Sequence, residues 1–473
     1  IQLVLVESAM LAATATLLGG AFAWWAAPWV MSRVNPPDQP LQLVLPADWR
    51  VLGFAAALSV VVTLLFGLAP ALRASHVQPA YALKGGDGGR SRLRLIHVLA
   101  AGQVAFCFVV HFSAGLFVDT FQRITHQPLG FNPQRLALVE VSVKNGKQVT
   151  GEAWRQVADT LRTTPGVESA AMCSWPLMSG NAWTGTIRMP GKGPEAVEAF
   201  YLAVDPGFIP TMGIALKQGR NLNEADKAEG GGAAVVSEAF VRRYFGGGRA
   251  VGRTFERLSR EHAVRYEVVG VVADVRDRSL RDPLQPVVFV PGDASGTFAV
   301  RTAGADPLAM APALRTAISQ ARPDFRVSNT YTQQMLVDKW SIRERLLATL
   351  SVFFAAVAMA LAGIGLYGVL NYSVQMRTRE LGIRMALGAS ARHVGARVMA
   401  RIGVVFAVGA AAGLAGGLSS ERAIGTLLYA AHVSDPGALA VPLAVVGATA
   451  LIASIPPLLR AIRIDPARTL RAE

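Results

Sequence analysis

Six long stretches without a charged residue constrain this sequence more than any other feature. Each is about as long as the ~20 residues that a helix needs to cross a bilayer, and they cover 8–32, 51–72, 95–118, 346–372, 402–420 and 436–459. Apolar residues make up 52% of the chain and charged residues only 16%. This composition excludes a disordered chain and argues against a soluble enzyme. The predicted fold class is an α-helical integral membrane protein with six spans.

The net charge of +14 could indicate a nucleic-acid partner, so its distribution along the chain matters. Residues 119–345 hold 28 Lys and Arg against 23 Asp and Glu, whereas the remainder holds 18 against 9. Most of the basic excess therefore flanks the apolar stretches. We expect a lipid bilayer as the partner of this surface and no nucleic acid.

The basic residues also predict the orientation of the chain. They follow the second, fourth and sixth apolar stretches: Arg73, Lys84, Arg90, Arg92 and Arg94; Arg377, Arg379, Arg384, Arg392, Arg397 and Arg401; Arg460, Arg463, Arg468 and Arg471. The opposite short loops hold only Arg33, Arg50 and Arg422. Because cytoplasmic loops are enriched in Lys and Arg, we expect both chain ends in the cytoplasm and 119–345 on the outer face.

An internal repeat relates the start of the chain to its end, at a constant offset of 387 residues. The repeat pairs an acid, prolines, cations and small residues: Asp48 with Asp435, Pro70 with Pro457, Arg73 with Arg460, Ala74 with Ala461, Pro79 with Pro466, Ala80 with Ala467, Leu83 with Leu470, and Lys84 with Arg471. We therefore predict that 1–90 are the last two spans of a first module. The second module would comprise one span at 91–118, an external domain at 119–345, and three spans with a tail at 346–473. Because the chain starts inside an apolar run, we expect the leading part of the first module to be missing.

The external segment alternates β-rich and helical patterns. Strands are expected at 234–236, 266–272, 287–290 and 298–301, and helices at 151–163 and 306–321. At this length the segment can bury its own core, so we expect a large α+β domain with two lobes.

No motif in the sequence predicts catalysis. The chain lacks G-x-S-x-G, H-E-x-x-H and the phosphate-binding G-x-x-x-x-G-K-[ST]. Its two cysteines, Cys107 and Cys173, are too few for a disulfide scaffold or a cysteine-based zinc site. We expect a protein that is not an enzyme and carries no cofactor, with any ATP hydrolysed by another chain.

Two groups of residues are candidates for function. The cytoplasmic run R-T-R-E-L-G-I-R-M-A-L-G-A at 377–389 predicts a short amphipathic helix. Such a helix either anchors to anionic lipid or docks in a groove of a partner ATPase. Inside the third span, Gln103 and His111 are eight residues apart and share a helix face. An interhelical hydrogen bond is the favoured role for this pair, and substrate contact is the alternative.

These residues, with the closing Pro-x-x-Arg-Ala and Asp-Pro-Ala-x-x-Leu-Arg runs, resemble the FtsX-like permease domain of the MacB family of ABC transporters. The external segment looks like the MacB periplasmic core domain. The runs that carry this likeness are 205–208, 212–214, 219–226, 242–245 and 268–276. The internal duplication is similar to that of the acidobacterial-type duplicated permeases, here truncated at the N-terminus.

The resemblance implies a type VII ABC permease in the bacterial cytoplasmic membrane, with 119–345 in the periplasm. A separate ATPase dimer would drive periplasmic export by mechanotransmission. The resemblance assigns ATPase coupling to Arg379, Glu380, Gly382, Arg384 and Gly388, and allows a periplasmic adaptor or substrate protein as a further partner. Two alternatives stay open: an FtsX-like signalling scaffold that controls a periplasmic enzyme, and a lipoprotein-releasing permease.

Overall fold

The computed structural model divides the chain into two compact units, which we describe separately. A helical unit comprises Ile1–Gln122 and Arg343–Glu473, and a β-rich unit comprises Arg123–Ile342. The structure describes residues 2–34, 49–64, 88–144, 149–190, 193–226, 231–258, 263–292, 296–376, 378, 383, 385, 387, 390–429 and 436–462.

The helical unit is built from long apolar helices: α1 (Gln2–Val34), α2 (Trp49–Thr63), α5 (Gly88–Thr125), α11 (Ile342–Gln375), α13 (Ala391–Ile424) and α14 (Pro436–Ile462). Helices suit these sequences because a helix satisfies its own backbone polar groups where no water is available. Five of the helices contain segments long and apolar enough to cross a membrane: Val6–Ser32, Ile96–Thr125, Ile342–Gln375, Gly395–Ser420 and Gly437–Ile462.

Five of the six predicted spans are thus supported. The second predicted stretch, 51–72, coincides with α2, whose apolar segment Trp49–Val61 is shorter than a span. Residues 65–72 lie outside the described residues. The sixth span remains a prediction.

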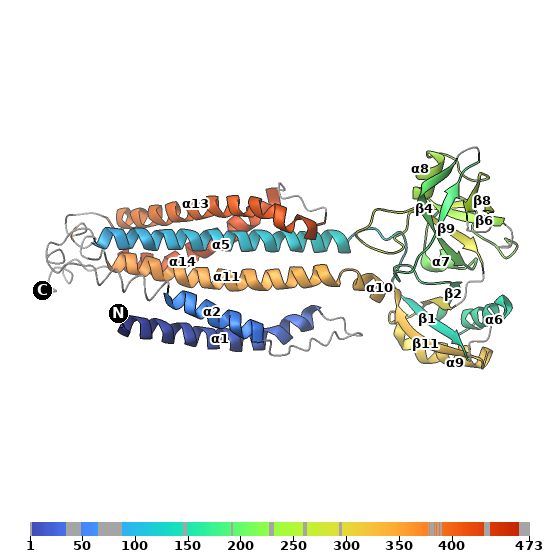
Figure 1. Ribbon diagram of the computed structural model, residues 1–473, viewed down its shortest axis with the longest axis horizontal. Helices are drawn as coiled ribbons and strands as arrows, with labels where there is room; N and C mark the ends of the chain where they lie inside the picture. The colour runs from blue at the N-terminus through green and yellow to red at the C-terminus, as the bar shows by residue number, and fades with distance from the viewer. Residues whose placement is uncertain are drawn as a thin grey trace. The chain divides into compact units, whose positions relative to one another are not determined.

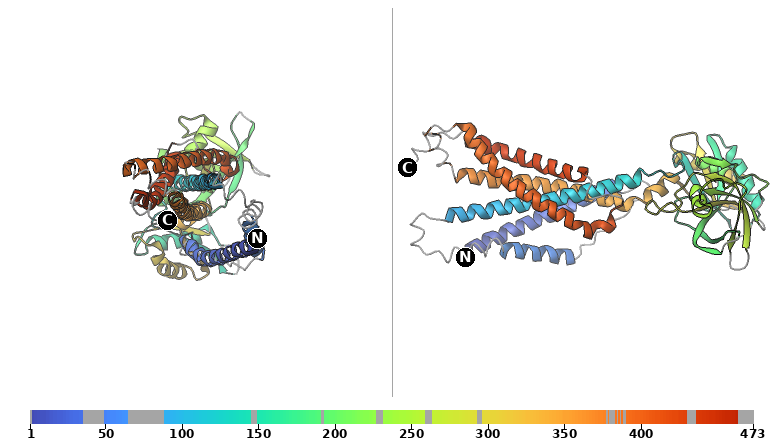
Figure 2. Two further views of the ribbon diagram at one scale, coloured as in Figure 1. Left: turned by 90° about the vertical axis from the view of Figure 1, so that its left-hand side faces the viewer. Right: turned by 90° about the horizontal axis from the view of Figure 1, so that it is seen from above.

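Helices α5, α11, α13 and α14 run alongside one another and share one core (Figures 1 and 2). Ala100 of α5 packs there with Leu366 of α11, Ile402 of α13 and Ala450 of α14. Glycines allow α13 to approach α5 closely. A Cβ atom on Gly413 would lie 2.7 Å from the Cβ of Phe108 and 2.9 Å from the carbonyl oxygen of Ala105.

The internal repeat coincides with a repeated helix pair. Shifting α1 and α2 by 387 residues places them on α13 and α14, and Trp49 falls on Pro436, where the second helix of each pair begins. Each pair packs as a unit, and the hydroxyls of Thr16 and Ser59 hydrogen-bond to each other between α1 and α2. Phe22 of α1 also stacks on Phe353 of α11, with ring centroids 5.8 Å apart.

The β-rich unit contains eleven strands: β1 (Leu136–Val143), β2 (Val167–Cys173), β3 (Trp183–Arg188), β4 (Pro194–Val204), β5 (Leu216–Gly219), β6 (Gly231–Ser237), β7 (Thr254–Leu258), β8 (Ala263–Val272), β9 (Val287–Pro291), β10 (Thr297–Thr302) and β11 (Phe325–Thr332). All four predicted strands are confirmed, as β6, β8, β9 and β10. Both predicted helices are confirmed too. One is α6 (Gly151–Arg162), and the other is η3 (Pro307–Met310) followed by α9 (Ala311–Ala321).

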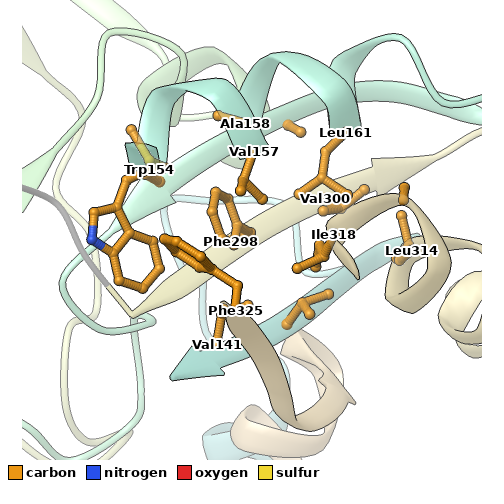
Figure 3. Packing of buried hydrophobic residues seen from close by; sticks show 14 of the residues in the cluster. Val141, Trp154, Val157, Ala158, Leu161, Phe298, Val300, Leu314, Ile318 and Phe325 are labelled. Atoms are coloured by element: carbon orange, nitrogen blue, oxygen red, sulfur yellow. The ribbon is translucent and has the colours of Figure 1, made fainter. Parts of the chain in front are cut away.

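The first lobe is an antiparallel sheet in the order β11-β1-β10-β2, packed against α6 and α9. Figure 3 shows its core, in which side chains of α6 point onto the sheet. Trp154 and Phe325 pack in a T-shaped arrangement, with their ring centroids 4.6 Å apart. Val157 and Leu161 continue the buried stripe at helical spacing, and all three side chains belong to one hydrophobic cluster.

The second lobe is a closed ring of six strands. The order β4-β3-β7-β8-β6-β9 returns to β4, because β9 also pairs with β4 in parallel. Its core is separate from that of the first lobe and includes Tyr201, Val236, Phe255 and Val288, together with Phe240 of α8 (Glu238–Phe245). The pairing of Cys173 with Val204 connects β2 of the first lobe to β4 of the ring.

The runs that resemble the MacB periplasmic core domain are called family-like runs below. Several of their residues hold the second lobe together. Gly219 has a φ of +72°, and a Cβ atom there would collide with the carbonyl oxygen of Val269 on β8. Arg220 pairs with both carboxylate oxygens of Asp226, at 2.7 and 2.8 Å. These runs therefore contribute to the fold of the domain.

Asp274 belongs to the same group and ties the loop after β8 to α8. Its carboxylate accepts hydrogen bonds from the backbone amide of Ala239 and from the guanidinium of Arg242. A carboxylate at the first turn of α8 also complements the helix dipole.

Candidate functional site

The residues predicted to couple the chain to an ATPase belong to the run at 377–389. Arg379, Glu380, Gly382, Arg384 and Gly388 all lie outside the described residues. The candidate site that the structure does describe is the polar group inside the helical unit, where Gln103 and His111 were predicted to matter.

Two side chains of α5 hydrogen-bond to the backbone of α11. Gln103 Nε2 donates to the carbonyl oxygen of Leu361 at 2.9 Å, and Cys107 Sγ donates to that of Ala358 at 3.2 Å. Both carbonyl groups belong to the middle of α11 and are one helical turn apart. Bonds of this kind between apolar helices contribute about 0.6–2 kcal/mol each. We call the row of Gln103, Cys107 and His111 on α5, together with these two carbonyl groups, the polar seam.

Gly365 makes room for the first of these bonds. A Cβ atom on Gly365 would collide with the side-chain amide of Gln103, whereas a Cβ on Gly368, one turn further along α11, would meet nothing within 4 Å. The glycine thus lets a polar side chain fit between two tightly packed helices.

His111 lies one turn beyond Cys107 and bonds within its own helix. Its Nδ1 contacts the carbonyl oxygen of Cys107 at 2.9 Å. Since a carbonyl only accepts hydrogen bonds, Nδ1 is the donor in this contact. No hydrogen bond from His111 to another helix is present in this part of the structure. The role predicted for His111 therefore remains a prediction.

The three seam residues line a small cavity between α5, α11 and α14. Its volume is about 10 Å³, and Met359, Ala362, Val446 and Thr449 complete most of the wall. A space of this size holds one water molecule or one ion.

Sequence reasoning missed Cys107 and Met359. Cys107 could have been found, because it lies midway between Gln103 and His111 at intervals of four residues, on the same helix face. Met359 gave no such signal, since its importance depends on which helix packs against α5.

The β-rich unit also contains an ion pair with a buried carboxylate. Arg162 Nη2 lies 2.6 Å from Asp205 Oδ2, and the Asp205 side chain is only 6% exposed. Burial raises the pKa of Asp205 to about 6, and the nearby Arg162 offsets only part of that effect. The acids Asp274, Asp277 and Asp282 do not form a metal site: no group of three or more His, Cys, Asp or Glu gathers in the described ranges.

Comparisons with known proteins identify both parts of the chain. The model of the MacB-like periplasmic core domain matches residues 98–328, and that of the FtsX-like permease C-terminal domain matches residues 352–466. These matches bear out the resemblance that the sequence motifs suggested.

Three relatives illustrate the similarity. The macrolide export ATP-binding/permease protein MacB 1/2 of Paracoccus denitrificans is 27% identical over 64% of this chain and 47% of its own length. The pyoverdine export ATP-binding/permease protein PvdT of Pseudomonas fluorescens is 25% identical over 66% and 49%. An uncharacterized ABC transporter permease of Bacillus subtilis, YvrN, is 23% identical over 57% and 69%.

The chain spans about half the length of the two export proteins, at 47% and 49%. The matched models cover most of the β-rich unit and most of helices α5, α11, α13 and α14. The chain therefore belongs to the MacB-like permeases, membrane proteins that combine a MacB-like periplasmic core domain outside the cytoplasm with an FtsX-like permease domain.

Proposed function

We propose that this chain is the permease part of a MacB-like, type VII ABC exporter and that a separate ATPase subunit energises it. One observation carries the proposal: a MacB-like periplasmic core domain and an FtsX-like permease domain occur in one chain, with helices of spanning length on both sides of the β-rich unit. No phosphate-binding loop occurs in residues 1–473, so ATP hydrolysis would take place elsewhere.

The helices that lead into and out of the β-rich unit would transmit the motion. The chain enters that unit from α5 and leaves it into α11, and both are uninterrupted helices. The Gln103 and Cys107 bonds hold α5 in register with α11, and Gly413 keeps α13 tightly packed on α5. Because packed helices shift as stiff bodies, displacement at their cytoplasmic ends would reach the external domain. This is a mechanotransmission mechanism.

The run at 377–389 is the proposed contact with the ATPase. Arg379, Glu380, Gly382, Arg384 and Gly388 would form the coupling surface, with the charged residues setting the orientation of the partner. ATP would bind to that partner. The membrane would be the bacterial inner membrane, with the β-rich unit in the periplasm.

The substrate would be collected in the periplasm. The relatives are named for macrolides and for pyoverdine, so membership in the family leaves the substrate of this chain open. A periplasmic adaptor is a further proposed partner.

Affinity capture of the full-length protein from native membranes tests the proposal. We expect an ABC ATPase to co-purify with the wild type and to be lost from the Gly388→Trp variant. Gly425→Trp is the matched control, because a side chain at Gly425 would meet nothing within 4 Å. The control should retain the ATPase.

Other outcomes would overturn the proposal. Capture of a cell-wall hydrolase without an ATPase would indicate the signalling scaffold, and capture of lipoproteins with an ATPase would indicate a lipoprotein-releasing permease. Equal ATPase recovery from both tryptophan variants would return 377–389 to the lipid-anchor interpretation.

A further inference from the structure

The cavity beside the polar seam brings together three side chains that bind soft metal ions. Cys107 and His111 come from the same face of α5, and Met359 comes from α11. They offer a thiol, an imidazole and a thioether. Thiolate and thioether ligands select Cu(I) among the biological transition metals, and imidazole is also suited to copper.

The imidazole is held in the tautomer that such a site needs. Because Nδ1 of His111 donates to the carbonyl oxygen of Cys107, the lone pair of the neutral ring is on Nε2. A hydrogen bond from the second ring nitrogen to a backbone carbonyl is the usual support of a metal-binding histidine.

The thiol is already fixed at the interface of the two helices. Cys107 is 2% exposed, and its Sγ contacts the carbonyl oxygen of Ala358, the residue before Met359. The sulfur of Cys107 is therefore on the side of α5 that faces α11, and Cys107 and Met359 line the same cavity. A bound ion would bridge the two helices.

Charge and size favour a monovalent ion over zinc. The wall of the cavity is mostly apolar, with Ala100, Val104, Leu366 and Val446 among its residues, and its volume of about 10 Å³ fits one ion without a hydration shell. A monovalent ion bound to one thiolate and two neutral ligands has no net charge, so its burial costs little. A divalent ion would leave an uncompensated positive charge.

We propose that Cys107, His111 and Met359 form a binding site for Cu(I), or its analogue Ag(I), inside the helical unit. On binding, the S–H bond of Cys107 breaks, a sulfur–metal bond forms, and the proton passes to the buffer. The ion keeps its oxidation state. The bound ion replaces the Cys107 hydrogen bond and fastens α5 to α11 beside the Gln103 bond. This site is independent of the proposed export function.

Ag(I) binding to the purified full-length protein in detergent tests the site. Ag(I) is the probe because, unlike Cu(I), it does not oxidise in air. We expect one Ag(I) per chain and a higher midpoint of thermal unfolding. Cys107→Ser, His111→Phe and Met359→Leu should each weaken binding at least about tenfold, since even residues behind a metal ligand have effects of that size.

Two variants are matched controls. Cys173→Ala removes the other buried cysteine, which lies in the β-rich unit. Met10→Leu removes an exposed methionine of α1. Both should bind Ag(I) like the wild type. Loss of binding in Cys173→Ala, or full binding in Cys107→Ser, would overturn the proposal.

X-ray absorption at the silver edge keeps the test decisive if a substitution unfolds the protein. The wild type should show two sulfur ligands and one nitrogen ligand. A spectrum with sulfur alone would exclude His111, and one with only oxygen and nitrogen ligands would exclude the site.

Discussion

Asp205 shows how one residue of a family-like run affects the stability of the β-rich unit. It lies at the end of β4, just before the short helix α7 (Phe208–Met212). Its carboxylate is buried against Arg162 at the end of α6, whose Nε donates to the carbonyl oxygen of Ala170 on β2. Arg162 thus connects α6 of the first lobe both to β2 and, through Asp205, to the end of β4 in the second lobe.

The raised pKa of Asp205 predicts a pH dependence of stability. The pKa is about 6 in the folded protein against an ordinary value of 3.8, so the folded state binds this proton more tightly than the unfolded chain. The stabilisation of the folded state by protonation of Asp205 is complete below pH ~4. It is lost as the pH rises through about 6.

Comparison with Asp205→Asn isolates this effect. The free energy of unfolding of the wild type, relative to the variant, should fall between pH 4 and 7 by up to about 1.4 kcal/mol per pH unit. Hydrogen exchange of the 205–212 amides in the full-length protein is the measurement. Asp159→Asn is the control, because Asp159 also pairs with Arg162 but is 70% exposed. A difference that does not change with pH would contradict the burial argument.

At the scale of elements, the contact between α5 and α13 depends on glycine. Gly409, Gly413 and Gly417 form one stripe on α13, and a Cβ atom at each would lie within 3.0 Å of an atom of α5. Backbone atoms are among the neighbours at Gly409 and Gly413, so the helices would have to move apart. On α1, the repeat places Phe22, Ala26 and Val30 at these positions, so the two copies of the helix use different packing surfaces.

We expect Gly413→Ala to destabilise the helical unit by about 1–3 kcal/mol, the usual cost of forcing an extra group into a packed interface. The midpoint of thermal unfolding in detergent should fall accordingly. Gly403→Ala on the same helix is the matched control, since its Cβ would meet nothing within 4 Å. Equal midpoints for both variants would show that close packing of α5 and α13 is not required.

At the scale of the whole molecule, the central prediction is the membrane topology. Lys217 is exposed in β5 and Ser390 is exposed just before α13. Cysteine introduced at each should react with a membrane-impermeant maleimide from opposite sides of the inner membrane. Cys107 and Cys173 are both buried, so background labelling should be low. Labelling of both positions from the same side would refute the orientation.

The sequence by itself determined the class of protein, five of the six spans that it predicted, the α+β nature of the external unit and its main strands. These follow from hydropathy, charge and residue periodicity, which act along short lengths of chain and can be read without knowing any distant contact. The family-like runs could also be recognised from the sequence, but their contribution to the packing of the second lobe could not be predicted from it. The coupling residues at 379–388 remain a prediction because they lie outside the described residues.

Only the tertiary structure decided how distant segments meet. The ring closes because β9 pairs with β4, and the polar seam forms because Gln103 and Cys107 lie against Leu361 and Ala358, about 250 residues further along the chain. Met359 and Gly365 acquire their significance in the same way. A local pattern can show that a residue is polar or small, but the neighbour that it contacts is chosen by the packing of the whole chain.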